Sequence, residues 1–331
     1  MTPRKQIAKT IKDYNHFLLT SHINPDGDAI GSMLGLGHLL NRMGKTFTFY
    51  NQSGLPERFS WLNLPAKMHT RIPLQEYEWA IILDCGDGDR LGENLGTFLD
   101  TDKSINIDHH YGNPEFGRYN WVEPHRSSVG EMIALLAQDL GMELNGDMAK
   151  SLYLAMVTDT GSFSYSNTGA ETFSIASEII KGGLDLDSFN SHLYQQWSLN
   201  KVHLHGLAMK HANLYCQDRV GLIKIPAELM QQTGTNPEDC EGVVNYVRSI
   251  KGVKVAISLR EDSENKIKMS LRSWGEVDVN AIAHSLGGGG HHNAAGGTFY
   301  MSMQEAEGLV LEKIEQHLDS GPEDRNWAQV T

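Results

Sequence analysis

The sequence predicts an α/β protein with two domains, a larger one built on a parallel sheet and a smaller α/β one. The chain of 331 residues is long enough for two separate hydrophobic cores. Short apolar runs alternate with helical patterns through the first half, which is typical of parallel strands buried on both faces. After a polar stretch over residues 187–210, a second series of strands and helices begins.

The first domain is expected over residues 1–186, and apolar runs mark its strands. The run 79–83 (WAIIL) is continuous and too short for a core helix. Acidic residues follow several of these runs, at the strand ends where open α/β sheets bind ligands. The predicted strands are residues 16–20, 46–50, 79–83 and 104–107.

Caps mark the helices between and after these strands. Ser128, with Glu131 three residues later, predicts a capping box, in which each side chain satisfies a backbone N–H of the other residue. Thr168 and Glu171 repeat this pattern and predict a second helix start. The remaining predicted helices of this domain are residues 29–42, which end before Gly44, and the apolar residues 148–157, which lead to Asp159.

The polar stretch 187–210 is expected to be a linker helix, followed by a second domain over residues 211–320. Residues 321–331 are expected to form a flexible tail. The predicted strands of the second domain are residues 220–225, 253–260, 266–272 and 298–300, and its helices are residues 237–249, 279–286 and a last one from Ser302 to about residue 318.

Charge and composition limit the classes of partner. The net charge is −13, with −9 in residues 1–190, and binding along a nucleic-acid backbone needs many lysines and arginines. We therefore expect no long nucleic-acid track. Cys85, Cys216 and Cys240 show no CxxC spacing, which indicates reduced thiols. The chain starts without an apolar signal core and has no apolar run near the length of a membrane span, so we expect a cytoplasmic protein with no membrane partner.

A turn rich in acidic residues is the first candidate site. Residues 22–32 (HINPDGDAIGS) place His22, Asp26 and Asp28 between a predicted strand and a predicted helix. Clusters of Asp and His at strand ends hold divalent metals around phosphate groups, and the start of a helix offers N–H groups to phosphate. The alternative is a simple helix-capping turn, because Asp-Gly is a common turn pair.

Three further positions extend this cluster. Asp84 ends an apolar strand, where a charge is costly unless it is bound or solvated. In Asp108-His109-His110 the neighbouring imidazoles point in different directions, so one can bind metal while the other faces phosphate, and Asp108 can orient an imidazole. The alternative is a pair of surface histidines. Asp159 ends a helix, a position that the helix dipole disfavours for an acid.

The second domain carries a glycine run and two arginines of interest. Glycines at 287–290, followed by His291, allow a backbone to approach a ligand closely, although a flexible loop is the alternative. Arg248 and Arg272 could clamp a phosphate or a carboxylate, whereas most exposed arginines are only surface charges.

Together these segments resemble the DHH phosphoesterase superfamily. The sequence HINPDGDAIGS at 22–32, LDCGD at 83–87, DHH at 108–110 and TDTGSF at 158–163 resemble its four motifs in order. The sequence LRS at 271–273, DVNAIA at 278–283 and GGGGHHNAAG at 287–296 resemble the DHHA1 substrate-binding domain. The resemblance covers roughly residues 15–320 and implies an active site in the cleft between the domains.

The resemblance implies two divalent metal ions, with Mn²⁺ preferred and Mg²⁺ or Co²⁺ as alternatives. One ion would be held by His22, Asp26 and Asp84. The other would be held by Asp28, Asp84, His109 and Asp159, so that Asp84 bridges the two. His110, with Asp108 and Asp84, would serve catalysis at the scissile phosphate. The implied substrate-binding residues are Arg248, Arg272, Gly289, Gly290 and His291.

The implied activity is hydrolysis of short oligonucleotides such as pApA, and of the phosphomonoester of 3′-phosphoadenosine 5′-phosphate (pAp). Size and domain pairing resemble the bacterial oligoribonucleases of the family that also act on pAp. The implied partners are short oligonucleotides and nucleotide phosphates. The sequence leaves the oligomeric state open, with a homodimer as one option. Alternatives are a cyclic-dinucleotide phosphodiesterase, a polyphosphate or pyrophosphate hydrolase, and a nucleotide-binding sensor without activity.

Overall fold

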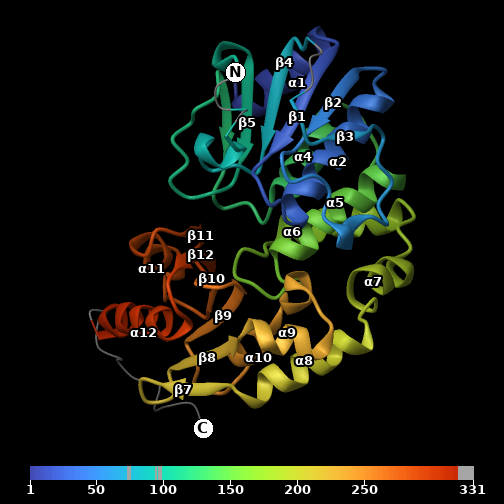
Figure 1. The fold of residues 1–331 in the computed structure, drawn as a ribbon. Coiled ribbons are helices and arrows are strands. Elements are labelled where there is room, and N and C mark those ends of the chain that lie inside the picture. The colour runs from blue at the N-terminus through green and yellow to red at the C-terminus, as the bar shows by residue number, and fades with distance from the viewer. Residues whose placement is uncertain (73–75, 94, 96–98, 320–331) are drawn as a thin grey trace, which may run out of the picture. The chain divides into compact units, whose positions relative to one another are not determined.

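A computed structural model divides the chain into two compact units, Met1–Gln196 and Trp197–Thr331 (Figure 1). The structure describes residues 1–72, 76–93, 95 and 99–319. The boundary lies within the segment 187–210 that the sequence assigns to one linker helix. That segment instead forms two helices, α7 (Leu186–Tyr194) and α8 (Leu199–Lys210), one on each side of the boundary. The predicted tail, 321–331, lies outside the described residues.

A six-stranded parallel sheet forms the centre of the first unit. Its strand order is β3-β2-β1-β4-β5-β6, and every neighbouring pair is parallel. The four strands that the sequence predicts are confirmed, and two at the sheet edges were missed, because they are too short or too polar to give an apolar run. The strands are β1 (His16–Ser21), β2 (Thr46–Tyr50), β3 (Met68–His69), β4 (Trp79–Leu83), β5 (Ser104–Asp108) and β6 (Tyr119–Val122).

The strand order reverses between β1 and β4, and this point places the candidate site. Ser21 of β1 lies in register with Leu83 of β4, so the residues that follow these strands, His22 and Asp84, leave the sheet side by side. In open parallel sheets the carboxyl ends of the strands at such a reversal form the ligand site.

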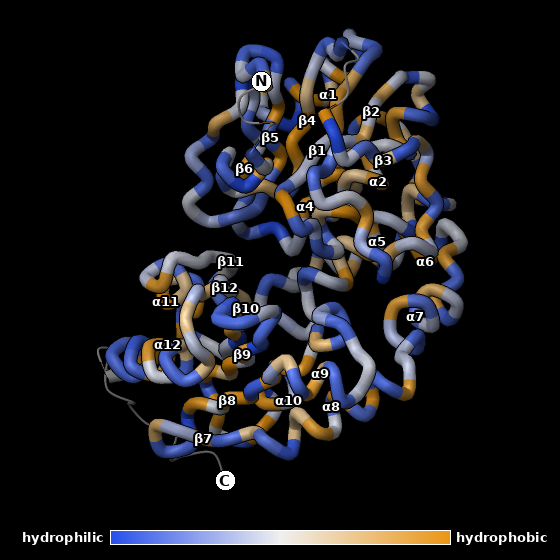
Figure 2. Tube along the Cα trace, viewed as in Figure 1, coloured by the Kyte–Doolittle hydropathy of each residue, from blue (hydrophilic) through white to orange (hydrophobic). Residues whose placement is uncertain are grey.

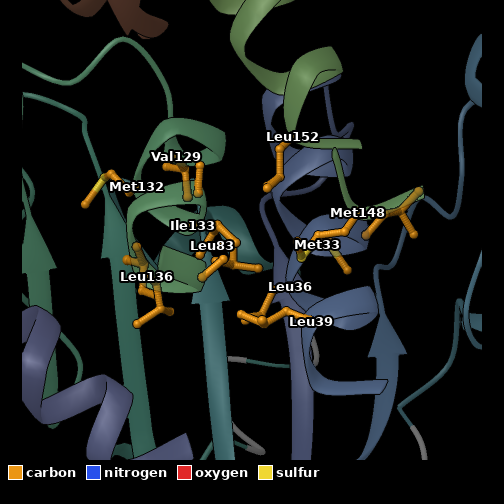
Figure 3. Close-up of a cluster of buried hydrophobic side chains, with 14 of the residues drawn as sticks. Met33, Leu36, Leu39, Leu83, Val129, Met132, Ile133, Leu136, Met148 and Leu152 are labelled. Atoms are coloured by element: carbon orange, nitrogen blue, oxygen red, sulfur yellow. The ribbon is translucent and has the colours of Figure 1, made fainter. Parts of the chain in front are cut away.

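Helices pack against this sheet and bury its apolar strands. Figure 3 shows Met33, Leu36 and Leu39 of one helix and Met132 and Leu136 of another gathered around Leu83 of β4. Ile81, Leu83 and Ile105 are fully buried, as continuous apolar strands predict. The helices are α1 (Pro3–Asp13), α2 (Gly27–Arg42), α4 (Val129–Asp139), α5 (Gly146–Asp159) and α6 (Ala170–Lys181), besides α7.

Glycines let α2 approach α5 closely. Gly27, Gly31 and Gly35 recur every four residues and therefore share one face of the helix. A Cβ atom at Gly31 would lie 2.5 Å from the carbonyl oxygen of Ser151, and one at Gly27 would overlap the side chain of Thr158. This close packing brings the start of α2 to the end of α5.

Two predicted helix starts differ in outcome. Ser128 caps α4 by accepting a hydrogen bond from the N–H of Glu131, so the predicted start is confirmed, but the reciprocal half of the capping box is absent because the Glu131 oxygens bond other side chains. The start predicted at Thr168 is wrong by one residue, because Gly169 is the cap of α6 and its N–H donates to the Thr172 hydroxyl at 3.2 Å.

The second unit contains a mixed six-stranded sheet in the order β11-β12-β10-β9-β8-β7. The pair β8–β9 is parallel and the other pairs are antiparallel. Its strands are β7 (Asn213–Tyr215), β8 (Val220–Ile225), β9 (Val255–Ser263), β10 (Lys266–Ser273), β11 (Gly289–His291) and β12 (Ala294–Tyr300), and its helices besides α8 are α9 (Ala227–Thr233), α10 (Val243–Arg248), α11 (Val279–Ser285) and α12 (Met303–Asp319).

One predicted helix of this unit is wrong. Residues 237–249 form a short 3₁₀ helix, Pro237–Cys240, and then α10, because Gly242 between them has φ of +86° and interrupts the helix. The glycine run 287–290, for which a flexible loop was the alternative, contributes to a strand, β11. Apolar segments such as β8 appear orange in Figure 2, in agreement with their burial. Within the described part of the chain, no helix has the length and apolar character needed to cross a membrane.

Candidate metal centre

Six of the predicted site residues meet at the carboxyl edge of the first sheet, and all belong to the first unit. Their ligand atoms form two groups with mutual distances within 4.8 Å, and a seventh residue, His110, forms a third group with Asp84 and His109. The two groups are His22, Asp26 and Asp84, and Asp28, His109 and Asp159.

His22 follows β1 and points one ring nitrogen toward carboxylates. Its Nδ1 donates to the carbonyl oxygen of Ile23 at 2.8 Å, which leaves Nε2 directed at Asp84 Oδ2, 3.6 Å away, and Asp26 Oδ1, 4.0 Å away. Burial lowers the pKa of His22, but the two carboxylates outweigh it and raise this pKa above its usual value. Asp26 is the half-exposed N-cap of α2, as the alternative reading of this turn expects, and its carboxylate also lies in the first group.

Asp84 lies at the centre of the cluster and is almost fully buried. Its φ of +52° is unusual for a residue with a Cβ atom, and such strain is concentrated at functional sites. Burial raises the pKa of Asp84, but the imidazoles of His22, His110 and His109 outweigh it, so the carboxyl pKa is lowered and the group is ionised. Within the described residues, Asp84 Oδ1 is buried and accepts no hydrogen bond.

His109 directs its Nε2 atom at three carboxylates. Its Nδ1 donates to the carbonyl oxygen of Arg126 at 3.0 Å. The distances from Nε2 to Asp28 Oδ2, Asp159 Oδ2 and Asp84 Oδ1 are 3.5, 3.6 and 3.8 Å. These distances exceed those of ordinary hydrogen bonds, so Nε2 lies near three carboxylate oxygens without a close bond to any of them.

Asp28 and Asp159 are carboxylates held close together in spite of their repulsion. Both oxygens of Asp28 accept N–H groups from the start of α4, from Val129 at 2.7 Å and from Gly130 at 2.9 Å. Burial, and then repulsion by Asp84 and other carboxylates, raise the pKa of Asp28 well above its usual value. Burial likewise raises the pKa of Asp159 to about 7, against the opposing effect of His109.

These features fit a site for divalent cations. Two buried carboxylates (Asp28 and Asp84), the partly buried Asp159 and two imidazole nitrogens with Nδ1 already engaged form a set of acceptors that favours positive charge among them. Carboxylates with imidazoles are ligands for ions such as Mn²⁺, and no thiolate competes, since burial raises the pKa of the Cys85 thiol to about 12. The residues present therefore fit a pair of divalent ions.

His110 has a different environment from His109, as predicted for adjacent histidines whose imidazoles point in different directions. The two rings are 5.4 Å apart at 75°. His110 Nδ1 donates to Asp108 Oδ1 at 2.8 Å, and Asn113 donates to Asp108 Oδ2 at 2.6 Å. Its other nitrogen lies 3.4 Å from Nη1 of Arg90. Asp108 therefore orients His110 and belongs to none of the ligand groups.

Sequence reasoning missed several residues that hold this cluster in place. Asn113 and Arg90 flank the His110 pair, and Arg90 also accepts the N–H of Ile23 with its carbonyl oxygen at 2.8 Å. Asn167 donates to the backbone carbonyl of Ser127 and to Asp159 Oδ2, at 3.0 and 3.3 Å. Asparagines and arginines in loops give no periodic signal in the sequence. Only their nearness to the motifs at 83–87 and 108–110 could have indicated Arg90 and Asn113.

Glu131 is a buried carboxylate that was predicted only as a capping residue. Its side chain also accepts hydrogen bonds from three other side chains. Its oxygens accept hydrogen bonds from Arg126 Nη1 at 3.1 Å, from the Ser127 hydroxyl at 2.6 Å and from the Thr172 hydroxyl at 2.7 Å. The segment that it fixes supplies the carbonyl that orients His109 and the N–H groups that bind Asp28.

In the second unit the structure brings together four of the five predicted substrate-binding residues. Arg272 of β10 is in register with Ala294 of β12, which is in register with His291 of β11, and Gly289 and Gly290 are also in β11. The side chain of His291 lies outside the described part. Arg248 is placed differently, on α10, with its guanidinium 4.6 Å from the ring centroid of Trp274.

Comparison with known proteins identifies the relatives of this chain. A model described as the DHH family, N-terminal domain, matches residues 16–157, and a DHHA1 domain model matches residues 222–320. A Thermus thermophilus protein named bifunctional oligoribonuclease and PAP phosphatase NrnA is 32% identical over 305 residues, which cover 91% of this chain and 89% of that protein. The Bacillus subtilis protein of the same name is 28% identical over 313 residues, which cover 93% and 97%.

A solved structure has the same fold. The crystal structure of an exopolyphosphatase-related protein from Bacteroides fragilis is 30% identical, with a TM-score of 0.87 over 96% of this chain and 97% of that one. The structural similarity extends through both domains. The two family models together, and the alignment with the Thermus thermophilus relative, also cover both domains. The chain therefore belongs to the DHH phosphoesterase family, with a DHH domain followed by a DHHA1 domain.

Proposed function

We propose that this protein hydrolyses phosphodiester bonds in short oligonucleotides and the phosphomonoester of pAp with two divalent metal ions. The observation that carries the proposal is the position of Asp84. Its two oxygens face different imidazoles, His22 at 3.6 Å and His109 at 3.8 Å, as expected of a carboxylate that two ions share. The names of the Thermus thermophilus and Bacillus subtilis relatives support the substrate class.

In this proposal His22, Asp26 and Asp84 hold one ion, and Asp28, Asp84, His109 and Asp159 hold the other. Ions bound there would supply the Lewis acidity that activates water and neutralises charge on the phosphoryl oxygens. The preference for Mn²⁺, with Mg²⁺ and Co²⁺ as alternatives, rests on the carboxylate and imidazole donors.

The other residues of the first unit bind and orient the reacting group. Asp108 accepts the Nδ1 proton of His110, so His110 presents Nε2 beside the Arg90 guanidinium. Arg90 forms no ion pair with a carboxylate of the described residues, which leaves its charge available to a phosphoryl oxygen. His110 would move a proton at the leaving oxygen, and Arg90 would stabilise the developing negative charge.

The proposed binding residues of the second unit remain Arg248, Arg272, Gly289, Gly290 and His291. Among these, Arg272 and the glycine strand lie on neighbouring strands of one sheet, which suits contact with one ligand. Arg248 stacks on Trp274, an exposed ring that could also contact a base.

The test is product release in the presence of Mn²⁺ from pApA, a trimer RNA, a 24-mer RNA, pAp, cyclic di-AMP, polyphosphate and pyrophosphate. Rapid conversion of pApA and pAp with slow conversion of the 24-mer is the expected result. Asp84→Asn should remove activity on every substrate, because it disturbs both proposed ions at once.

A second candidate is hydrolysis of polyphosphate, which the name of the Bacteroides fragilis protein suggests at 30% identity. Preference for polyphosphate or cyclic di-AMP would keep the metal centre and replace the proposed substrate. Absence of turnover on the whole panel, with nucleotide binding retained, would indicate a sensor.

A further inference from the structure

One short segment, residues 126–130, is connected to every member of one ligand group of the metal centre. The members of this group, the second group, are Asp28, His109 and Asp159. The carbonyl oxygen of Arg126 accepts the Nδ1 proton of His109 at 3.0 Å. Two successive N–H groups at the start of α4, within the same segment, donate to the carboxylate of Asp28 at 2.7 and 2.9 Å. The segment therefore fixes the direction of both side chains.

Asp159 is connected to this segment through the side-chain amide of Asn167. The amide nitrogen donates to the backbone carbonyl oxygen of Ser127 at 3.0 Å and to Oδ2 of Asp159 at 3.3 Å. Oδ2 is also the Asp159 atom that faces Nε2 of His109, 3.6 Å away. A displacement of the segment would therefore move atoms that contact, or lie one residue from, all three members of the second group.

Glu131 holds the segment 126–130 from the interior of the first unit. Only 2% of its surface is exposed, and a buried carboxylate is tolerated only when it is bonded and paired. Its Oε1 atom accepts a hydrogen bond from Nη1 of Arg126 at 3.1 Å. Its Oε2 atom accepts the hydroxyl groups of Ser127 at 2.6 Å and of Thr172, in the first turn of α6, at 2.7 Å. Among the described residues, the Glu131 side chain bonds to no member of the second group, so its effect on an ion would be indirect.

A different residue holds the other ligand group. The members of this group, the first group, are His22, Asp26 and Asp84. Asn51 follows β2 and is 1% exposed. Its Nδ2 atom donates to the carbonyl oxygen of His22 at 2.9 Å and to the hydroxyl of Ser21 at 3.0 Å. Asn51 therefore fixes the backbone from which His22 projects, at a place in the sheet that is separate from the Glu131 contacts.

We propose that each of the two ions has its own positioning residue, Glu131 for the ion at the second group and Asn51 for the ion at the first group. The proposal rests on the proposed function, because it assumes that each group holds an ion. Loss of a group that orients a metal ligand weakens metal binding by about 10–100-fold. Asp84 is shared by both proposed ions, so a substitution there cannot separate them. Substitutions at Glu131 and Asn51 should separate them, although neither residue belongs to a ligand group.

The test is calorimetric titration of the full-length protein with Mn²⁺, which needs no substrate. The wild type should bind two ions. Glu131→Ala should weaken one ion by about 10–100-fold and leave the other near its wild-type affinity, and Asn51→Ala should also weaken one ion. Glu131→Gln should weaken its ion several-fold, less than Glu131→Ala does, because the amide oxygen can still accept the two hydroxyl groups.

A ligand substitution identifies which ion each residue positions. Asp28→Asn should remove the ion at the second group and leave one Mn²⁺ bound per chain. In that background Glu131→Ala should change the remaining affinity by no more than about twofold, as expected of independent sites. Asn51→Ala should weaken the same remaining ion by about 10-fold or more. Equal weakening of this ion by the two substitutions would overturn the proposal.

Glu171→Gln is the matched control for charge. Glu171 is exposed in the first turn of α6 and, like Glu131, forms an ion pair with Nη1 of Arg126. Both glutamine variants remove one negative charge from the same guanidinium, but Glu131 also binds the Ser127 hydroxyl of the segment. Glu171→Gln should therefore change neither Mn²⁺ affinity by more than about twofold, because exposed ion pairs contribute little. Equal weakening by both variants would show a general charge effect and contradict the positioning role.

Melting temperatures in EDTA separate positioning from loss of the fold. If Glu131→Ala does not fold, Glu131→Gln and Asn167→Ala take its place, since Asn167 joins Asp159 to the same segment. Both variants should weaken the ion at the second group. Unchanged Mn²⁺ affinities in both would overturn the role of Glu131.

Turnover of phosphate compounds is measured apart from ion binding, so the two proposals fail differently. Two bound ions with the expected selectivity, but no turnover of any compound, would reject the proposed function and support the positioning residues. Two bound ions with unchanged affinities in folded Glu131→Ala and Asn51→Ala proteins would reject the positioning residues alone. Fewer than two ions bound to the wild type would reject both proposals.

Discussion

At the scale of single residues, Asp84 combines three properties that the other acids do not share. It is almost fully buried, its backbone is in the left-handed region, and its oxygens face imidazoles on both sides. A left-handed conformation costs about 1–3 kcal/mol for an ordinary residue, so the fold holds Asp84 there against a local preference.

Asp84→Asn should lower kcat by at least about 100-fold, because loss of a group that only orients a ligand already costs 10–100-fold. Titration with Mn²⁺ should show fewer than two ions bound per chain. Asp89→Asn, in the exposed part of the same loop, is the control and should keep wild-type activity. Activity near normal in Asp84→Asn would refute the shared-ligand role.

Asn113→Ala tests the orientation of His110. Asn113 donates a hydrogen bond to Asp108, and Asp108 accepts the Nδ1 proton of His110. Loss of the Asn113 side chain therefore frees the Asp108 carboxylate, which fixes the His110 ring. We expect kcat to fall about 10-fold, within the range for groups that orient a ligand, with unchanged Mn²⁺ stoichiometry. A loss of bound Mn²⁺ in this variant would place Asn113 in support of the metal ligands instead.

At the scale of elements, the α2–α5 contact sets the distance between two acids from opposite ends of the domain. Asp28 is in the first turn of α2 and Asp159 is the last residue of α5. The glycine face of α2 permits the approach that places both beside His109.

Gly31→Ala should destabilise the first unit by about 1–3 kcal/mol, because a Cβ atom there would lie 2.5 Å from the Ser151 carbonyl oxygen. Gly308→Ala is the matched control on α12, where the added Cβ meets no atom within 4 Å. That exchange should stabilise its helix by up to about 1 kcal/mol, since alanine is the better helix former. Urea denaturation measures both, and equal effects would contradict the packing explanation.

Much of the element pattern was predictable from local signals. The apolar strand 79–83 and the start of the last helix near Ser302 were found because hydrophobic runs and caps are encoded nearby in sequence. The break at Gly242 and the strand β11 were missed, since a glycine is compatible with turn, strand or helix end and only tertiary contacts decide.

The residues of the candidate site were also predictable from sequence only in part. The acids and imidazoles of the motifs were found because their types and spacing are specific to metal chemistry. Asn167 and the bonds of Glu131 were not, because they depend on which loops meet after folding. Contacts between residues 40 apart, such as Asn167 and Ser127, have no local signature in sequence.

At the scale of the whole molecule, the proposed ions should contribute to the stability of the first unit alone. Every ligand candidate is in residues 22–159, and the buried carboxylates repel one another without a cation. Mn²⁺ at about 100 times its dissociation constant should add about 2.7 kcal/mol of stability by mass action.

Scanning calorimetry of the full-length protein should therefore show two unfolding transitions. Mn²⁺ should raise the temperature of one transition, and EDTA should lower the temperature of that same transition. The other transition, from the second unit, should stay in place. Asp84→Asn should abolish the Mn²⁺ shift. A shift of both transitions together would contradict independent unfolding of the two units.

The confinement of all proposed metal ligands to the first unit has a consequence for how such proteins diversify. If the second unit binds the substrate as proposed, mutations of its binding residues would change which phosphate compounds are accepted without touching the proposed metal ligands. Selection would then act on chemistry and on choice of substrate separately, and a lineage would acquire a new substrate through substitutions in its second unit while its ancestral reaction is preserved.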